Sequence, residues 1–230
     1  IDEAKKIWPD DLIFDGRKAV ILQARGDLAE AQSVVDQLIA SPFQNEFGQV
    51  IAYQARLKRT ALLPPLQDCE KVADNPATAR WSIGTLMIWT DLLEGSGDRA
   101  KSQALLAKLR DSTEAVSKKQ PDNSPVMLAH AFALAGLGDR AAALNAVDEA
   151  LTRTASDARS HPVTEEAKAR LLSRFGDKEN AIPLLKHLLE TPYDGFYPPP
   201  LTAALLRLDP DFDSLRGDPR FERLCEEKQP

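Results

Sequence analysis

The chain has 230 residues, of which 43% are hydrophobic and 28% are charged, as is usual for a folded globular protein. Aromatic residues make up only 6% while Ala and Leu are abundant, which favours helices over sheets. The formal net charge of −6 argues against nucleic acid or an anionic membrane surface as a partner.

The start of the chain, its cysteines and its most apolar run limit further what the protein can be. Residues 4–8 read as the end of a helix followed by Pro9 and Asp10, so we expect an upstream element. Cys69 and Cys225 lie too far apart in sequence to suggest a metal pair or a disulfide framework. The most apolar run, residues 83–89, is far shorter than the roughly 20 residues that span a bilayer. We therefore expect no membrane insertion of this segment.

Gly-Asp dipeptides punctuate the chain at residues 26–27, 97–98, 138–139 and 176–177. Around Gly138, for example, residues 127–137 and 140–151 both read as helix. Glycine tolerates the left-handed conformation that ends a helix, and the aspartate can cap the next one. Pro64-Pro65 can serve as the missing turn in the long first gap. The spacing predicts five helix pairs, at about 10–42, 44–75, 77–119, 124–157 and 162–191.

Small residues recur at fixed distances from these turns. Five residues after each turn stand Ala31, Cys69, Ser102, Ala143 and Ala181. Seven residues before the Gly-Asp turns stand Ala19, Thr90, Ala131 and Ala169. Small side chains allow two helices to approach closely, so the pattern predicts a repeated antiparallel helix pair.

The sequence changes character after Thr191. Residues 192–200 form a proline-rich loop with Tyr193, Phe196 and Tyr197, and short helices are predicted at 201–208 and 218–227. The apolar residues predicted to face inward are Leu201, Leu205, Leu208, Phe212, Leu215, Phe221 and Leu224. Because a stacked array needs a terminal cap, residues 192–230 are predicted to supply one.

The repeat pattern resembles the tetratricopeptide repeat (TPR) over nearly the whole chain. The resemblance implies an all-α, right-handed α-solenoid of about five degenerate hairpins over residues 1–191. The family's tryptophan is absent, its places being taken by Asp15, Leu86, Met127 and Glu165, and most spacings exceed 34 residues. Residues 205–221 resemble the C-terminal end of bacterial multidomain signalling proteins, in which such an array follows a Ser/Thr kinase, a cyclase or a DNA-binding module.

In the TPR family the first helix of each pair lines a concave face that binds extended peptides. The resemblance places these residues on that face: Gln54, Lys58, Met87, Asp91, Leu128, Phe132, Glu166, Arg170 and Arg174. The Lys and Asn clamp that some relatives use for a terminal carboxylate is not reproduced, since Gly16, Val20, Leu128 and Phe132 occupy its positions. Basic Arg170 and Arg174 beside apolar Met87 and Phe132 suggest an apolar peptide with an acidic end.

No catalytic or metal motif stands out. Residues 95–102 lack the glycine that a phosphate loop places before its lysine. Asp209, Asp211 and Asp213 have calcium-loop spacing, but Ser214 and Arg220 occupy the required glycine and glutamate positions. We therefore read these aspartates as turn and cap residues. His130, His161 and His187 are far apart in sequence.

The sequence thus predicts a non-catalytic interaction or scaffold module in a signalling protein, with a protein or peptide partner and no cofactor. Two alternatives remain open. An apolar strip of Trp81, Ile88 and Trp89 would make the array a dimerisation element, and a pocket beside the aromatic loop 193–197 would make it a helical-repeat enzyme. The compartment is open too: cytoplasmic, or extracytoplasmic if a membrane span precedes the array.

Overall fold

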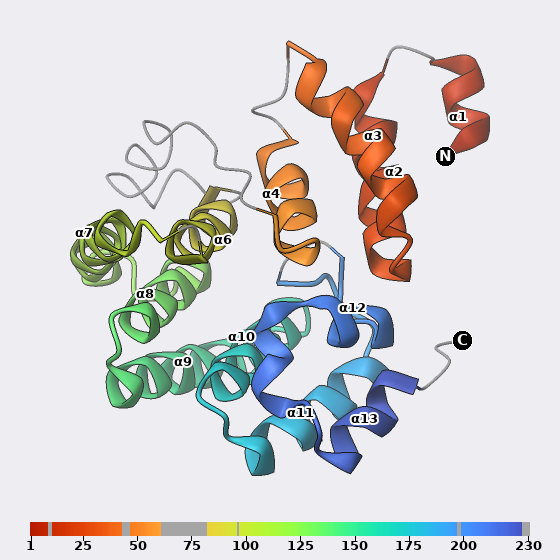
Figure 1. The fold of residues 1–230 in the computed structure, drawn as a ribbon. Coiled ribbons are helices and arrows are strands. Elements are labelled where there is room, and N and C mark those ends of the chain that lie inside the picture. Colours follow the sequence, from red (N-terminus) through yellow and green to blue (C-terminus); the bar gives the residue numbers. More distant parts are fainter. Residues whose placement is uncertain (9–10, 43–46, 61–81, 96, 197–198, 227–230) are drawn as a thin grey trace.

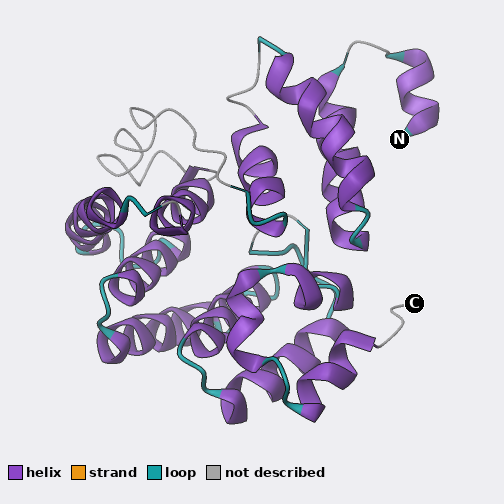
Figure 2. Cartoon of the chain, viewed as in Figure 1, coloured by secondary structure: helices purple, strands orange, loops and turns teal. Residues whose placement is uncertain are grey.

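Every regular element is helical in the part of the chain that the computed structural model describes, residues 1–8, 11–42, 47–60, 82–95, 97–196 and 199–226 (Figures 1 and 2). The helices before the C-terminal segment are α1 (Asp2–Ile7), α2 (Leu12–Arg25), α3 (Leu28–Ala40), α4 (Gly48–Leu57), α6 (Ser82–Gly95), α7 (Arg99–Ser117), α8 (Ser124–Gly136), α9 (Arg140–Thr154), α10 (Ser160–Arg174) and α11 (Lys178–Glu190). Within these ranges no helix has both the length and the apolar character to cross a bilayer.

The Gly-Asp turns join the helices of each pair as predicted. All four glycines have positive φ angles, between 69° and 89°. At the first turn the Asp27 amide donates to the Leu22 carbonyl at 2.9 Å, the bond that closes a glycine-ended helix. The aspartate caps are confirmed at two turns, where Asp139 accepts from the Ala142 amide and Asp177 from the Asn180 amide. Asp27 and Asp98 make no such side-chain bond.

The predicted small residues lie where paired helices meet. The pairs α2–α3, α6–α7, α8–α9 and α10–α11 each pack together. Their contacts bury the small side chains that the sequence singled out: Ala19, Ala31, Ser102, Ala131, Ala143, Ala169 and Ala181. The described residues thus confirm the helix pairs at the first, third, fourth and fifth positions. In the second, Pro64, Pro65 and Cys69 lie outside the described residues.

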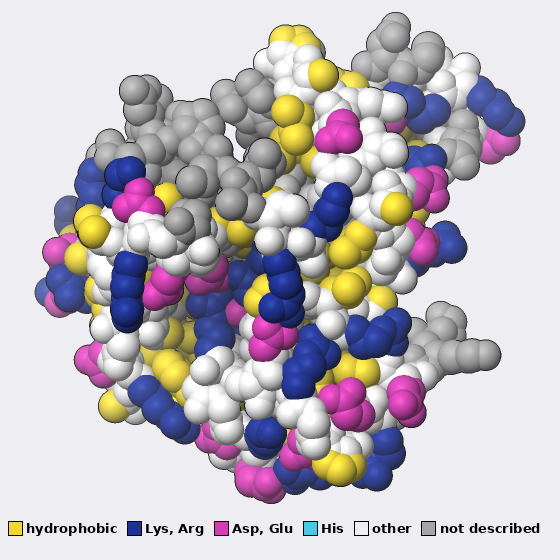
Figure 3. All heavy atoms as spheres, in the orientation of Figure 1, with side chains coloured by type: hydrophobic (Ala, Val, Ile, Leu, Met, Phe, Trp, Pro, Cys, Tyr) yellow, Lys and Arg dark blue, Asp and Glu magenta, His cyan; other side chains and the backbone are white. Residues whose placement is uncertain are grey.

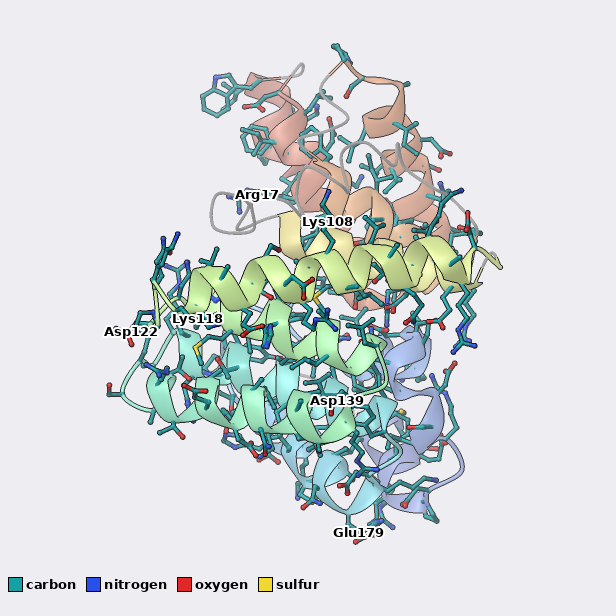
Figure 4. The ribbon with its side chains drawn as sticks, turned by 90° about the vertical axis from the view of Figure 1, so that its left-hand side faces the viewer. Arg17, Lys108, Lys118, Asp122, Asp139 and Glu179 are labelled. Atoms are coloured by element: carbon teal, nitrogen blue, oxygen red, sulfur yellow. The ribbon has the colours of Figure 1, made fainter. Side chains whose placement is uncertain are left out.

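The first helices of successive pairs also contact one another. Helix α2 packs on α4, α4 on α6, α6 on α8 and α8 on α10. Helices α7 and α9 lie on the outer side of this row, where Figure 4 labels half-buried Lys108 and exposed Lys118 and Asp139. The first helices therefore share a face that is separate from the second helices.

The C-terminal segment forms α12 (Ala203–Leu208), the 3₁₀ helix η3 (Pro210–Leu215) and α13 (Pro219–Glu226). Asp218 caps α13 and accepts from the Arg220 amide at 2.9 Å, as predicted. The apolar residues predicted to face inward are buried, except that Leu208 is only half-buried. The segment begins its helix at residue 203 rather than 201, because Thr202 supplies the cap to the Leu205 amide.

This segment contacts the first helix pair as well as the last. Helix η3 packs on α10, α13 on α11, and α12 on α2 (Figure 1). The Thr202 hydroxyl donates to the Ala24 carbonyl of α2 at 2.6 Å. The sequence predicted a cap for the far end of the array only. The structure shows a segment that connects both ends of the array.

Candidate functional site

Seven charged side chains from four elements meet where the C-terminal segment crosses the first helices. Helix α4 contributes Arg56 and α6 contributes Asp91. Glu166, Arg170 and Arg174 come from α10, where a spacing of four places them on one face. Asp209 and Asp211 come from the start of η3. We call these seven residues the charged cluster.

Arg170 lies at the centre of the charged cluster and is 0% exposed. Its Nε atom donates to Glu166 Oε1 at 2.8 Å. Its Nη1 atom lies 2.7 Å from Asp209 Oδ2 and 2.8 Å from Asp211 Oδ2. Because an unpaired buried charge is costly, these three carboxylates are what allow a guanidinium in the interior.

The other two arginines connect the same aspartates to α6. Arg56 places Nε 3.0 Å from Asp209 Oδ1 and Nη2 2.6 Å from Asp211 Oδ1. Arg174 donates from Nε to Asp211 at 2.6 Å and from Nη2 to Asp91 Oδ2 at 2.6 Å. Asp91 also accepts from Arg56 Nη1. The charged cluster is thus one continuous network across α4, α6, α10 and η3.

The environment shifts the pKa values of the buried carboxyls in opposite directions. Burial alone would raise the pKa of Asp209 and of Asp211, but the adjacent arginines outweigh it and hold both pKa values below their usual range. Burial raises the pKa of Glu166, although Arg170, the Phe196 amide and the Tyr193 hydroxyl oppose the rise. Asp209 and Asp211 are therefore ionised at neutral pH and neutralise the arginines.

Two pockets open beside the charged cluster and share Asp91 and Arg174. The α8-side pocket has a volume of about 350 Å³, and its lining is more polar than apolar. Met87, Leu106 and Phe132, each at most 4% exposed, are the apolar residues that we call its floor. The cap-side pocket has a volume of about 490 Å³, and its other lining residues are Arg56, Arg59, Thr60, Leu92, Gly95, Pro210 and Asp211. Figure 3 shows a hollow over this part of the molecule in which basic, acidic and apolar side chains lie together.

The structure brings four of the predicted site residues together in one pocket. Met87, Asp91, Phe132 and Arg174 all line the α8-side pocket. Because Met87, Asp91 and Glu94 are spaced by four and three residues, they occupy one face of α6. That this face binds a partner stays a prediction.

The remaining predicted residues do not face an open groove. Arg170 and Leu128 are buried. Gln54 is buried too, and its amide donates to the Leu28 carbonyl at 2.9 Å, toward α3. Lys58 is exposed but contacts Gln32, also on α3, at 3.1 Å. The side chains of Gln54, Leu128, Glu166 and Arg170 are therefore not accessible as expected, and those of Met87 and Phe132 are at most 2% exposed although they line the α8-side pocket.

Sequence reasoning missed that Asp209 and Asp211 pair with arginines. Asp209 does cap η3, accepting from the Asp211 amide at 3.1 Å, as a turn residue would. However, both side chains are also buried against Arg56 and Arg170. A signal was present: two acids lie among apolar residues predicted to face inward, and a buried acid needs a cation. Nothing in the sequence indicated that Arg56 pairs with Asp209, since the two residues lie 153 positions apart.

Two further expectations change. The proposed dimerisation strip included Ile88, which is 0% exposed, while Trp81 and the side chain of Trp89 lie outside what the structure describes. Two polar groups of the aromatic loop bind Glu166: the Tyr193 hydroxyl and the Phe196 amide donate to its Oε2 atom at 2.9 and 2.8 Å. Asp194 is exposed and lies 3.3 Å from Arg159. Tyr197 also lies outside the described residues.

Among the described residues, no group of three or more His, Cys, Asp or Glu side chains is placed to hold a metal ion. No protein-family model matches the chain, and comparisons with curated proteins and with solved structures find no match either.

Proposed function

We propose that the chain is a non-catalytic, TPR-like interaction or scaffold module that binds a protein or peptide segment across the two pockets. The module would be the C-terminal region of a larger bacterial signalling protein, and its helices would form a right-handed α-solenoid. Packing of each first helix on the next supports this arrangement, because a stack of hairpins buries its core in the same way.

One observation carries the proposal: residues from the first helices of three successive pairs meet around a shared pocket. Met87 and Asp91 of α6, Phe132 of α8 and Arg174 of α10 lie there together. Apolar floors with a few polar groups at the rim suit a bound side chain. The cap-side pocket continues past Asp91 toward η3, which would give an extended segment a second position to occupy.

The chemistry of the charged cluster favours recognition over catalysis. Its arginines and aspartates neutralise one another in pairs 2.6–3.0 Å long. Such pairs fix the relative positions of helices, which a binding surface needs. The Tyr193 hydroxyl, which an enzyme pocket beside the aromatic loop would need, donates to Glu166.

A photo-crosslinking experiment tests the proposal. A photoreactive amino acid replaces Glu94 at the rim of the α8-side pocket, or Asp122 on the outer side in Figure 4. We expect the Glu94 position to capture one protein that the Asp122 position does not. The captured protein, once purified, should bind the wild-type chain and lose affinity for Leu137→Glu, which places a charge in the pocket. Equal capture at both positions would contradict the proposal.

Self-association is a second candidate, because α1 and α2 expose large apolar side chains. Ile7, Trp8 and Ile13 are each more than half exposed. Trp8 stacks on Phe14 with ring centroids 6.1 Å apart, which holds its position on this surface. Light scattering over a concentration series distinguishes a dimer from a monomeric binding module.

A further inference from the structure

We infer that the segment bound across the two pockets carries a basic side chain next to an apolar one. This inference rests on the proposed function and names the chemistry of the partner. It reverses the expectation of an acidic peptide, which followed from Arg170 and Arg174 before their partners were known.

The balance of charge in the charged cluster favours a basic partner. The cluster has three guanidinium groups, from Arg56, Arg170 and Arg174. They face four carboxylates, from Asp91, Glu166, Asp209 and Asp211. One negative charge is therefore in excess. If Glu166 takes up a proton, the balance becomes zero, but in neither state is it positive. An added carboxylate finds no excess of positive charge here.

A partner can reach only some of these carboxylates. The side chains of Asp209, Asp211 and Glu166 are at most 2% exposed, whereas that of Asp91 is 28% exposed and lines both pockets. Glu94 lies one turn further along α6 and is 46% exposed at the rim. Its cation Arg99 is 76% exposed and 3.5 Å away, which is a weak surface contact.

An acidic partner would bind Arg174 at a cost. The Nε, Nη1 and Nη2 atoms of Arg174 already donate to Asp211 and Asp91. A partner carboxylate at Arg174 would have to displace Asp91, which would lose one of its two arginine partners in a partly buried position and keep Arg56. A partner ammonium or guanidinium group only adds a contact to Asp91. The site is therefore selective for the basic group.

The apolar requirement comes from the floor of the α8-side pocket. Met87, Leu106 and Phe132 line it next to Asp91. Phe132 is held in place because it stacks on Phe196 at 5.1 Å between ring centroids and lies under the Arg174 guanidinium. A Leu, Met or Phe side chain of the partner would fill this floor while its basic neighbour reaches Asp91 or Glu94.

The test uses the purified full chain and an array of ten-residue peptides. Each peptide places Leu, Met or Phe beside Lys, Arg, Gln or Glu, with all other positions randomised. We expect the Lys and Arg sets to bind about tenfold more tightly than the Glu set, with the difference shrinking as salt increases. Asp91→Asn should abolish most of the preference for Lys over Gln.

Two controls separate charge recognition from folding. Glu94→Gln removes a rim charge outside the buried network and should reduce the preference for Lys about threefold without lowering the melting temperature. Asp122→Asn removes an equal charge from a side chain that is 90% exposed on the outer side and should change nothing. Tighter binding of the Glu set, or an unchanged preference in both pocket variants, overturns the inference alone. Absence of binding by every set overturns the proposed function with it.

Discussion

Arg56 Nε lies 3.0 Å from Asp209 Oδ1, although 153 residues separate them in the sequence. The pair joins α4, near the start of the array, to the turn that begins η3. Arg59 and Asp213 repeat the connection at the surface, with two contacts of 2.7 Å. The C-terminal segment therefore holds the early helices in place through polar contacts as well as through its apolar packing.

Replacing Arg170 should destabilise the whole protein. Arg170→Gln removes a cation that three buried carboxylates share, and breaking a buried ion pair from one side costs about 3–5 kcal/mol. Urea unfolding followed by circular dichroism measures the loss. Arg153→Gln is the matched control, because Arg153 pairs with Glu149 on the surface and its replacement should cost much less stability. Equal losses in the two variants would show that the charged cluster stabilises the protein no more than a surface ion pair does.

The parts of the fold that follow from local sequence were predictable. Gly138 and Asp139 end one helix and begin the next. The hydrogen bonds that do this join residues within six positions of each other in the sequence. Ala143 is buried because its distance from that turn fixes which face of the helix it occupies. Such relationships repeat along the chain, so one sequence is enough to recognise them.

The charged cluster was not predictable in the same way. The position of Arg170 on the face that meets other first helices follows from its offset from the turn. That Asp209 and Asp211 meet this face depends on where the C-terminal segment returns, which no local pattern specifies. As a result the sequence indicated a basic groove, whereas the structure shows arginines that are already neutralised.

Replacing a glycine by alanine should cost different amounts of stability in two equivalent turns. At Gly138, with φ of +89°, a new Cβ meets open space, so Gly138→Ala should cost only about 1 kcal/mol of backbone strain. At Gly26 the new Cβ would also lie 3.3 Å from Ala204 Cβ of α12. We expect Gly26→Ala to lose more stability in urea unfolding. Equal losses would mean that α12 moves away freely and does not hold the first pair.

The hydroxyl of Tyr193 should stabilise the charge on Glu166. It donates to Glu166 Oε2 at 2.9 Å, and a hydrogen bond to a charged group contributes about 1.5–3 kcal/mol. Tyr193→Phe should therefore lower the free energy of unfolding by roughly that amount. A double-mutant cycle with Glu166→Gln isolates the contact, since the cost of Tyr193→Phe should fall when Glu166 is absent. Additive losses would mean that the hydroxyl acts on something else.

His130 should make the protein less stable in mild acid. Its ring lies between α7 and α8 with Nδ1 3.0 Å from the Thr113 hydroxyl, and burial lowers its pKa below the ordinary 6.5. The Arg110 backbone and Glu114 favour the charged form and the Arg110 side chain opposes it, but burial is the largest effect on the pKa. The unfolded chain therefore takes up a proton that the folded chain resists. Stability is complete above pH 6.5 and decreases as the pH falls through and below that value.

Urea unfolding at pH 8 and at pH 5.5 checks the sign of this dependence. We expect wild type to lose stability between the two pH values and His130→Gln to lose less, because glutamine can keep a polar contact with Thr113 without titrating. His187→Gln, which changes an exposed histidine on α11, should leave the wild-type difference intact. If His130→Gln loses as much stability as wild type, another group titrates in this range, and the contact between α7 and α8 does not depend on a neutral imidazole.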